Sequence, residues 1–207
     1  MKEQQMTKTM NGIAAPLELA NVDTDVIMPK RFLVTITREG LADGTFADLR
    51  FDNSGQPRPE FILNKAPWQK ATILIVGDNF GCGSSREHAV WGLRQLGIDA
   101  CIGTGFAGIF YDNARKNGLA LPIVSPEARD ALVTYAYRAS NAEISIQLER
   151  RTITAGQSSV PFEMNEATLT SLLGDRDDTL DSLDYSIAIR DFESGLDDRM
   201  RVNVMKS

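Results

Sequence analysis

The sequence predicts an α/β fold, because short apolar runs alternate with segments whose apolar residues recur every three or four positions. A β-rich run over 71–76 ends at Gly77, and the segment 86–96 then repeats apolar residues along one helical face. Further strand-like runs follow at 99–102 and 119–124. Strand, glycine-rich turn and helix therefore alternate through the middle of the chain, without the regular rhythm of a Rossmann fold.

The flanking segments extend this pattern. An extended apolar segment is predicted over 12–19, and Pro16 within it has no N–H to donate, so we expect a sheet edge or a bulge there. The stretch 51–67 is rich in proline and other turn residues and is predicted to be a surface excursion. Beyond residue 100 the pattern predicts a helix over 109–116, a helix over 126–136, a hairpin over 143–154 and a helix over 165–173.

The composition is that of an ordinary globular protein. The chain has 207 residues, of which 43% are hydrophobic and 24% charged, and it contains no internal repeat. We therefore expect one elaborated domain over 1–207, with an acidic tail of solvated turns from about residue 175. The formal net charge of −6 argues against sequence-independent binding of nucleic acid, which needs clustered Lys and Arg.

No membrane or secretory segment is predicted. The longest apolar runs are far short of the roughly 20 residues that a spanning helix needs. The first 11 residues have no apolar stretch behind their charges, so the cytoplasm is the expected compartment. In that reducing compartment the two cysteines, Cys82 and Cys101, are expected to be free thiols.

The loop that joins the predicted strand 71–76 to the predicted helix 86–96 is the richest in chemistry. Its glycines let a ligand approach the backbone, and unpaired N–H groups at the start of a helix favour an anion. Arg86 adds a planar fork that matches a carboxylate or a phosphate. The run from Ser84 to Glu87 also fits a capping box, in which Ser84 caps the helix and Glu87 bonds back to it. On local grounds both interpretations stay open.

Other catalytic motifs fit this loop poorly. A P-loop needs a lysine before its Ser or Thr, and a hydrolase elbow around Ser85 needs glycine where Glu87 stands. Cys82 with His88 as its base would form a thiol nucleophile, but both lie on one short segment. We therefore expect none of these three chemistries, and we expect the single histidine to be structural.

A second glycine motif follows the predicted strand 99–102. Gly103, Gly105 and Gly108 form a literal G-x-G-x-x-G. The next predicted strand, 119–124, has no acidic residue at its end to bind a ribose. We therefore expect turns and close packing here rather than a dinucleotide site.

An acidic turn precedes the basic pair Lys30 and Arg31. On extended backbone the carboxylates of Asp23 and Asp25 would share a face, yet two ligands are too few to define a metal site. An Asx-type turn that caps the short segment beginning near Pro29 explains them better. The basic pair is expected in solvent unless this turn closes on an anionic ligand.

Several motifs together carry a family resemblance. They are NVDTDVIMPKRFL over 21–33, FGCGSSREHA over 80–89, FAGIFYDN over 106–113 and KNGL over 116–119. Over roughly residues 5–170 the sequence resembles the small subunits of 3-isopropylmalate dehydratase, in the aconitase superfamily. The tail after about residue 175 is less typical of that family.

The resemblance implies the fold and the partner. The fold would be a swivelling β/β/α domain of the aconitase type, closing over a separate large subunit that carries a [4Fe-4S] cluster. No metal or cofactor is expected on this chain, because a cluster needs about three cysteine thiolates and the sequence has two cysteines. The implied reaction interconverts 2-isopropylmalate and 3-isopropylmalate through isopropylmaleate, a step of leucine biosynthesis, so the substrate would be a small dicarboxylate hydroxyacid.

The resemblance also implies residue roles. Ser84 would be the base that takes a proton from carbon, and its alkoxide would need the helix start, neighbouring backbone N–H groups and Arg86 to stabilise it. Arg86 would also bind a substrate carboxylate, with Ser85 donating a further hydrogen bond. Asp25 would support the Ser84 loop, and Arg38 is the candidate for a second carboxylate-binding arginine.

The variable end of the substrate would face residues 33–37. Leu33 and Val34 are apolar and suit an isopropyl group better than an additional carboxylate, whose unpaired burial is costly. Two alternatives stay open: a sister hydro-lyase that acts on homoaconitate or a methylated malate, and a non-catalytic binding module of the same fold. The intact run 84–86 disfavours the binding module.

Overall fold

One mixed β-sheet organises the part of the chain that the computed structural model describes, residues 8–33 and 40–174. Its six strands follow the order β3-β2-β1-β4-β5-β6. They are β1 (Thr9–Leu17), β2 (Ile73–Val76), β3 (Ala100–Ile102), β4 (Glu143–Gln147), β5 (Thr152–Ala155) and β6 (Ser158–Pro161). β1, β2 and β3 pair in parallel, whereas β4 pairs antiparallel with β1 and with β5, and β5 antiparallel with β6.

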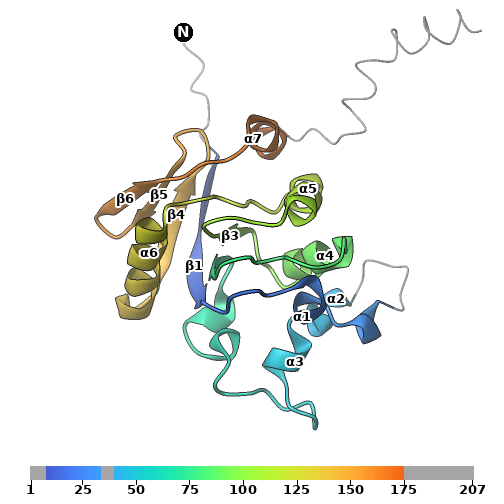
Figure 1. Cartoon of the computed structure of the whole chain (residues 1–207). Coiled ribbons are helices and arrows are strands. Elements are labelled where there is room, and N and C mark those ends of the chain that lie inside the picture. The colour runs from blue at the N-terminus through green and yellow to red at the C-terminus, as the bar shows by residue number, and fades with distance from the viewer. Residues whose placement is uncertain (1–7, 34–39, 175–207) are drawn as a thin grey trace, which may run out of the picture. The chain divides into compact units, whose positions relative to one another are not determined.

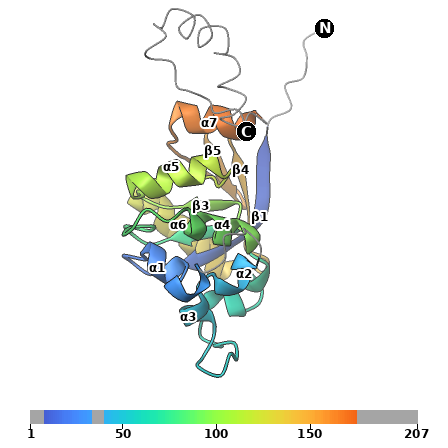
Figure 2. The same ribbon diagram turned by 90° about the vertical axis from the view of Figure 1, so that its right-hand side faces the viewer.

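Helices lie on both faces of this sheet. They are α1 (Thr24–Ile27), α2 (Leu41–Gly44), α3 (Ala47–Arg50), α4 (Glu87–Gln95), α5 (Gly108–Lys116), α6 (Pro126–Arg138) and α7 (Glu166–Leu173). α4 and α5, together with the short helices α1 to α3, lie on one side of the parallel strands, and α6 lies on the other (Figure 1, Figure 2). The predicted α/β class is therefore confirmed.

The parallel strands are buried on both faces, which is why their sequences are continuously apolar rather than alternating. In β2, Leu74 and Val76 pack in the core that α4 and α5 cover. Ile73 and Ile75 point the other way, into the core shared with α6. Each strand of this part of the sheet thus separates two apolar layers.

The placement predicted for the first strand was wrong, because β1 is central in the sheet rather than at its edge. The carbonyls of Ile13 and Leu17 accept from residues on the β2 side. Pro16 lies at the alternating position and so faces the β4 side, where the pairing ends at Ile13↔Glu143. The missing N–H of proline therefore leaves no ladder bond unmade.

Two further predictions need correction. Residues 119–124 run beside β3 and exchange backbone hydrogen bonds with it, but in the described structure they form isolated bridges rather than a strand. Pro122 has no N–H to donate, which interrupts the ladder. The stretch 51–67 is only partly a surface excursion, because Phe61 and Leu63 are buried in the core beneath α4. β6 was not predicted at all.

The described residues up to Leu173 form one compact unit. The tail from residue 175 lies outside the described residues, so one domain over the whole chain stays a prediction. No described helix is long and apolar enough to cross a membrane.

Candidate functional site

Three loops meet at the carboxyl ends of the parallel strands β1, β2 and β3. The N–H of Asn21, after β1, donates to the carbonyl of Asp78, after β2, at 2.8 Å. Phe80 of the second loop forms a parallel bridge with Phe106 of the third. Ligands of open α/β sheets bind at this edge, where loops converge beyond the strand ends. The predicted functional residues of the first two loops lie here.

The second loop is fastened to the first by strand-like pairing around Asp23 and Cys82. The N–H of Gly81 donates to the carbonyl of Val22 at 2.8 Å, and the N–H of Thr24 donates to the carbonyl of Cys82 at 2.9 Å. Gly81 has a φ of +77°, and a Cβ there would lie 2.3 Å from the ring of Phe110. Glycine is therefore required at Gly81 both by the backbone and by the packing.

Helix α1 begins at this junction. Asp23 caps it, because its Oδ1 accepts from the N–H of Val26 at 2.7 Å. An Asx-type cap is therefore present, but the predicted location was wrong: it caps α1 and not the segment that begins near Pro29, which has no side-chain cap. The next residue, Thr24, is 2% exposed. Its hydroxyl donates to the carbonyl of Ser84 at 3.0 Å. The start of α1 thus contacts the backbone of the predicted catalytic serine.

Asp25, the second residue of α1, forms an ion pair with Arg86. The Arg86 side chain is 16% exposed and the Asp25 side chain 43% exposed, so the pair lies at the boundary of the protein interior. A guanidinium has five N–H donors in a planar fork, so a partner at one edge leaves other donors for a ligand. The structure therefore brings together two of the three residues predicted to be catalytic.

Ser84 and Ser85 are exposed and lie just before α4. The capping-box interpretation was wrong, because the helix begins at Glu87 and its N-cap residue, Arg86, makes no side-chain cap. The carboxylate of Glu87 instead accepts from the side-chain amide of Asn117 at 2.8 Å. The two exposed serines are thus not used to cap this helix.

Sequence reasoning missed Thr24 and Asn117. Asn117 ends α5, and besides binding Glu87 its Oδ1 accepts from the indole N–H of Trp91 at 2.9 Å. It therefore bonds two residues on successive turns of α4. Asn117 stands before a glycine at a helix end, and Thr24 stands between two aspartates. Neither local pattern predicts which distant residue the side chain bonds.

The ring of His88 lies against Trp91, with 4.7 Å between the ring centroids.

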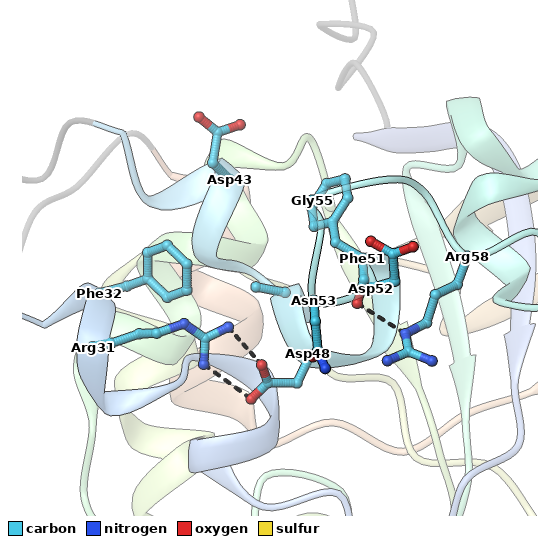
Figure 3. A pocket seen from close by; sticks show the side chains of 10 residues that line it. Arg31, Phe32, Asp43, Asp48, Phe51, Asp52, Asn53, Gly55 and Arg58 are labelled. Atoms are coloured by element: carbon cyan, nitrogen blue, oxygen red, sulfur yellow. Dashed lines mark hydrogen bonds and ion pairs between the residues drawn. The ribbon is translucent and has the colours of Figure 1, made fainter.

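The residues predicted to face the substrate are only partly described. Leu33 ends the 3-10 turn Lys30–Phe32 and packs partly buried against the core. Val34 and Arg38 lie outside the described residues. Beside this turn is a pocket of about 790 Å³ between α3 and the loop around Asp52 (Figure 3).

The basic pair of this region lies in solvent. Lys30 is exposed, and Arg31 points across the pocket wall to Asp48, whose carboxylate accepts from it at 2.5 and 3.2 Å (Figure 3). This hydrogen bonding lowers the pKa of Asp48 and raises the pKa of Arg31. Arg31 is thus already paired, and it is not a free anion-binding group.

The donor set of this chain does not fit an iron-sulfur cluster. Cys82 and Cys101 are both free, as predicted. Cys101 is fully buried in β3, and burial raises the pKa of its thiol well above the ordinary value, which disfavours the thiolate that a cluster binds. Across residues 8–33 and 40–174, no group of three or more His, Cys, Asp and Glu side chains is arranged to hold a metal.

Packing accounts for one glycine of the G-x-G-x-x-G run. A Cβ on Gly103 would lie 3.0 Å from the ring of Phe106 and 3.1 Å from Val76, so close packing explains glycine there. Gly105 and Gly108 face open space, and neither has a positive φ. The expectation of close packing is therefore confirmed at the first position only.

The fold and the loop place the chain in a known class. Residues 4–128 match the family model described as the aconitase C-terminal domain. The 3-isopropylmalate dehydratase small subunit of Agrobacterium fabrum is 47% identical over 92% of this chain and 94% of its own length. That of Rhizobium rhizogenes is 50% identical over 89% of this chain and 92% of its own length. The chain belongs to the family of 3-isopropylmalate dehydratase small subunits, within the aconitase superfamily.

A solved structure agrees with this placement. The crystal structure of a 3-isopropylmalate dehydratase from Methanocaldococcus jannaschii superposes with a TM-score of 0.64 at 25% identity. The match covers 89% of this chain and 99% of that one. The predicted aconitase-type fold is thereby confirmed.

Proposed function

We propose that this chain is the small subunit of a 3-isopropylmalate dehydratase. Together with a large subunit it would dehydrate 2-isopropylmalate to isopropylmaleate and rehydrate this to 3-isopropylmalate, in the leucine biosynthesis of the cytoplasm. One observation carries the proposal: a chain of this family presents Ser84, Ser85 and Arg86 on a loop that α1 holds at the ligand-binding edge of the sheet.

In this proposal Ser84 is the general base that removes the proton from carbon. An unperturbed hydroxyl is too weak a base, so its alkoxide must be stabilised by preorganised positive groups. Two lie within the same turn: the N-terminal end of α4, with its unpaired N–H groups, and the guanidinium of Arg86. The pairing with Asp25 fixes the direction of that guanidinium.

Substrate binding is assigned to the same loop and to the segment after α1. Arg86 and Ser85 bind one carboxylate, and Arg38 is the candidate for the second. Leu33 and Val34 are assigned to the isopropyl end of the substrate, because apolar side chains favour the isopropyl group over an extra carboxylate. A Lys would not replace Arg86, because the planar fork binds Asp25 and a carboxylate at the same time.

The exposure of Ser84 and Ser85 supports a partner subunit. Preorganised electrostatic stabilisation needs a site from which water is excluded, and on this chain both serines face solvent. The large subunit would cover them. Since the donors of this chain do not fit a [4Fe-4S] cluster, we assign the cluster to the large subunit as well.

The test is the hydration of isopropylmaleate by the purified chain, alone and mixed anaerobically with a cluster-loaded large subunit. We expect turnover only in the mixture, and a higher kcat/KM for isopropylmaleate than for the corresponding homoaconitase substrate. Turnover by the isolated chain would overturn the proposal. So would the absence of turnover in a mixture whose subunits associate and whose cluster is intact.

A further inference from the structure

Consecutive residues of α1 contact the loop that joins β2 to α4, residues 77–86, which we call the functional loop. Asp25 pairs with the side chain of Arg86, and Thr24 donates its hydroxyl to the carbonyl of Ser84 at 3.0 Å. The first contact concerns a charge, whereas the second fixes the backbone of the serine itself. Thr24 is 2% exposed, so its hydroxyl cannot exchange this acceptor freely for water.

The hydroxyl of Thr24 is not used to cap its own helix. A threonine at the start of a helix often serves as its cap, but Asp23 already caps α1 through the N–H of Val26. The bond of Thr24 instead reaches a residue 60 positions away in the sequence. Its acceptor, the Ser84 carbonyl, belongs to the predicted catalytic residue.

The loop has few other constraints at this point. Backbone pairing with the first loop ends at the carbonyl of Cys82, and Gly83 follows in the left-handed region with a φ of +91°. Within the residues that the structure describes, no other hydrogen bond holds the backbone of residues 83–85. The next fixed element is α4, which begins at Glu87.

One hydrogen bond therefore sets the orientation of the peptide between Ser84 and Ser85. In a planar trans peptide the C=O and the following N–H point in opposite directions. A carbonyl that points to Thr24 turns the N–H of Ser85 to the other side, and it fixes the rotation of the chain from which the Ser84 side chain projects.

We propose that Thr24 is the positioning residue of Ser84. It touches no reacting atom. It holds the Ser84 peptide so that the hydroxyl stays aligned with Arg86, which its neighbour Asp25 holds. This inference rests on the proposed role of Ser84, and its test separates the two.

The test compares Thr24→Val, which keeps the branched shape and removes the hydroxyl, with Thr24→Ser, which keeps the hydroxyl. Both are assayed in the reconstituted complex. We expect the valine variant to lower kcat by about 10-fold to 100-fold with KM changed less than about threefold, since small misplacements of reacting groups have effects of this size. The serine variant should stay within about threefold of wild-type kcat.

Thr45→Val is the matched control. Thr45 is fully buried, and its hydroxyl donates to the carbonyl of Leu41 at 2.9 Å, so the same substitution removes the same kind of bond. It should lower thermal stability as Thr24→Val does but leave kcat unchanged. If Thr24→Val does not fold, Thr24→Ala is compared with Thr45→Ala in the same way.

The outcomes are distinct. Unchanged kcat in Thr24→Val, or an equal loss of kcat in both valine variants, would overturn the positioning role. Full turnover by Ser84→Ala in the same assay would instead remove the proposed function on which this role rests. Loss of kcat in Thr24→Val alone, restored in Thr24→Ser, supports the proposal.

Discussion

The charge of Arg86 is largely withdrawn from water, and Asp25 is its partner. Removing one member of such a pair leaves the other without compensation, which costs more than the pair itself contributes. The ion pair with Asp25 therefore favours one geometry of the loop, in which the guanidinium of Arg86 has a fixed direction in the chain without ligand.

Replacing Asp25 with Asn keeps the shape of the side chain and removes its charge. We expect kcat in the reconstituted complex to fall about 100-fold, because Arg86 loses its fixed direction. The free energy of unfolding should fall by about 1–3 kcal/mol, less than for a fully buried pair because Asp25 is partly exposed. Steady-state kinetics and chemical denaturation measure the two effects.

Glu166→Gln is the control for Asp25→Asn. It breaks the exposed Arg151–Glu166 pair, and exposed pairs contribute less than about 1 kcal/mol. Its kcat should equal that of the wild type. Wild-type kcat in Asp25→Asn would contradict the role assigned to this carboxylate.

Single residues show what the sequence could predict and what it could not. Asp25, Ser84 and Arg86 were predicted to share a site because they lie in two motifs, and the structure brings the two segments into contact. Thr24 was passed over, because a hydroxyl that bonds a distant carbonyl leaves no local pattern. A capping box was one of the two interpretations left open for Glu87, because the local pattern is present; in the structure its carboxylate accepts from Asn117 instead.

Helices α4 and α5 are joined through one side chain. The amide of Asn117 bonds the carboxylate of Glu87 and the carbonyl of Asn113, both at 2.8 Å, and its oxygen accepts from Trp91. Since Glu87 is the first residue of α4, this contact holds the turn that follows the functional loop. The stability of the pair of helices should therefore depend on it.

Asn117→Ala should lower the free energy of unfolding by about 1–3 kcal/mol, because it leaves the partly buried Trp91 indole and Glu87 carboxylate without this partner. Denaturant midpoints measure the change. Asn141→Ala provides the comparison, since Asn141 also bonds a glutamate, Glu143, but on the surface. Equal changes in the two variants would show that Asn117 does not join the helices.

Helices and strands were predicted correctly where the signal lies in their own sequence. They were predicted wrongly where the pairing between strands determines the structure. The central strands and helices follow apolar periodicity, and their observed bounds lie within three residues of the predicted ones. Pro16 misled the placement of β1, because nothing in its own sequence shows that β4 pairing stops before it. β6 has a mostly exposed pattern, and within the part of the chain that the structure describes it pairs with β5 alone, so no apolar run marked it.

At the largest scale, the described residues up to Leu173 are built around a sheet with a core on each face, and Cys101 of β3 lies within one of these cores. Burial raises the pKa of its thiol in the folded protein. In the unfolded chain the thiol ionises near its ordinary pKa of about 8.5. Below that pH both states keep the proton, and stability does not depend on this group. Above it only the unfolded state loses the proton, so the folded state becomes less stable.

We therefore expect the wild type to lose stability with rising pH above about 9, more steeply than Cys101→Ala by up to about 1.4 kcal/mol per pH unit. Urea denaturation of the two proteins between about pH 8 and 10.5 measures the difference in slope, whatever the alanine costs at neutral pH. Parallel slopes would contradict the buried thiol as the titrating group.

The general-base role of Ser84 is tested most directly by the turnover of Ser84→Ala in complex with the cluster-loaded large subunit. Because Ser84 is exposed and uses its backbone rather than its side chain to contact α1, the variant should fold and bind the large subunit as the wild type does. We expect a fall in kcat of about 1,000-fold or more, the size expected for loss of a general base. Wild-type turnover would contradict it, and would leave this loop with a structural role only.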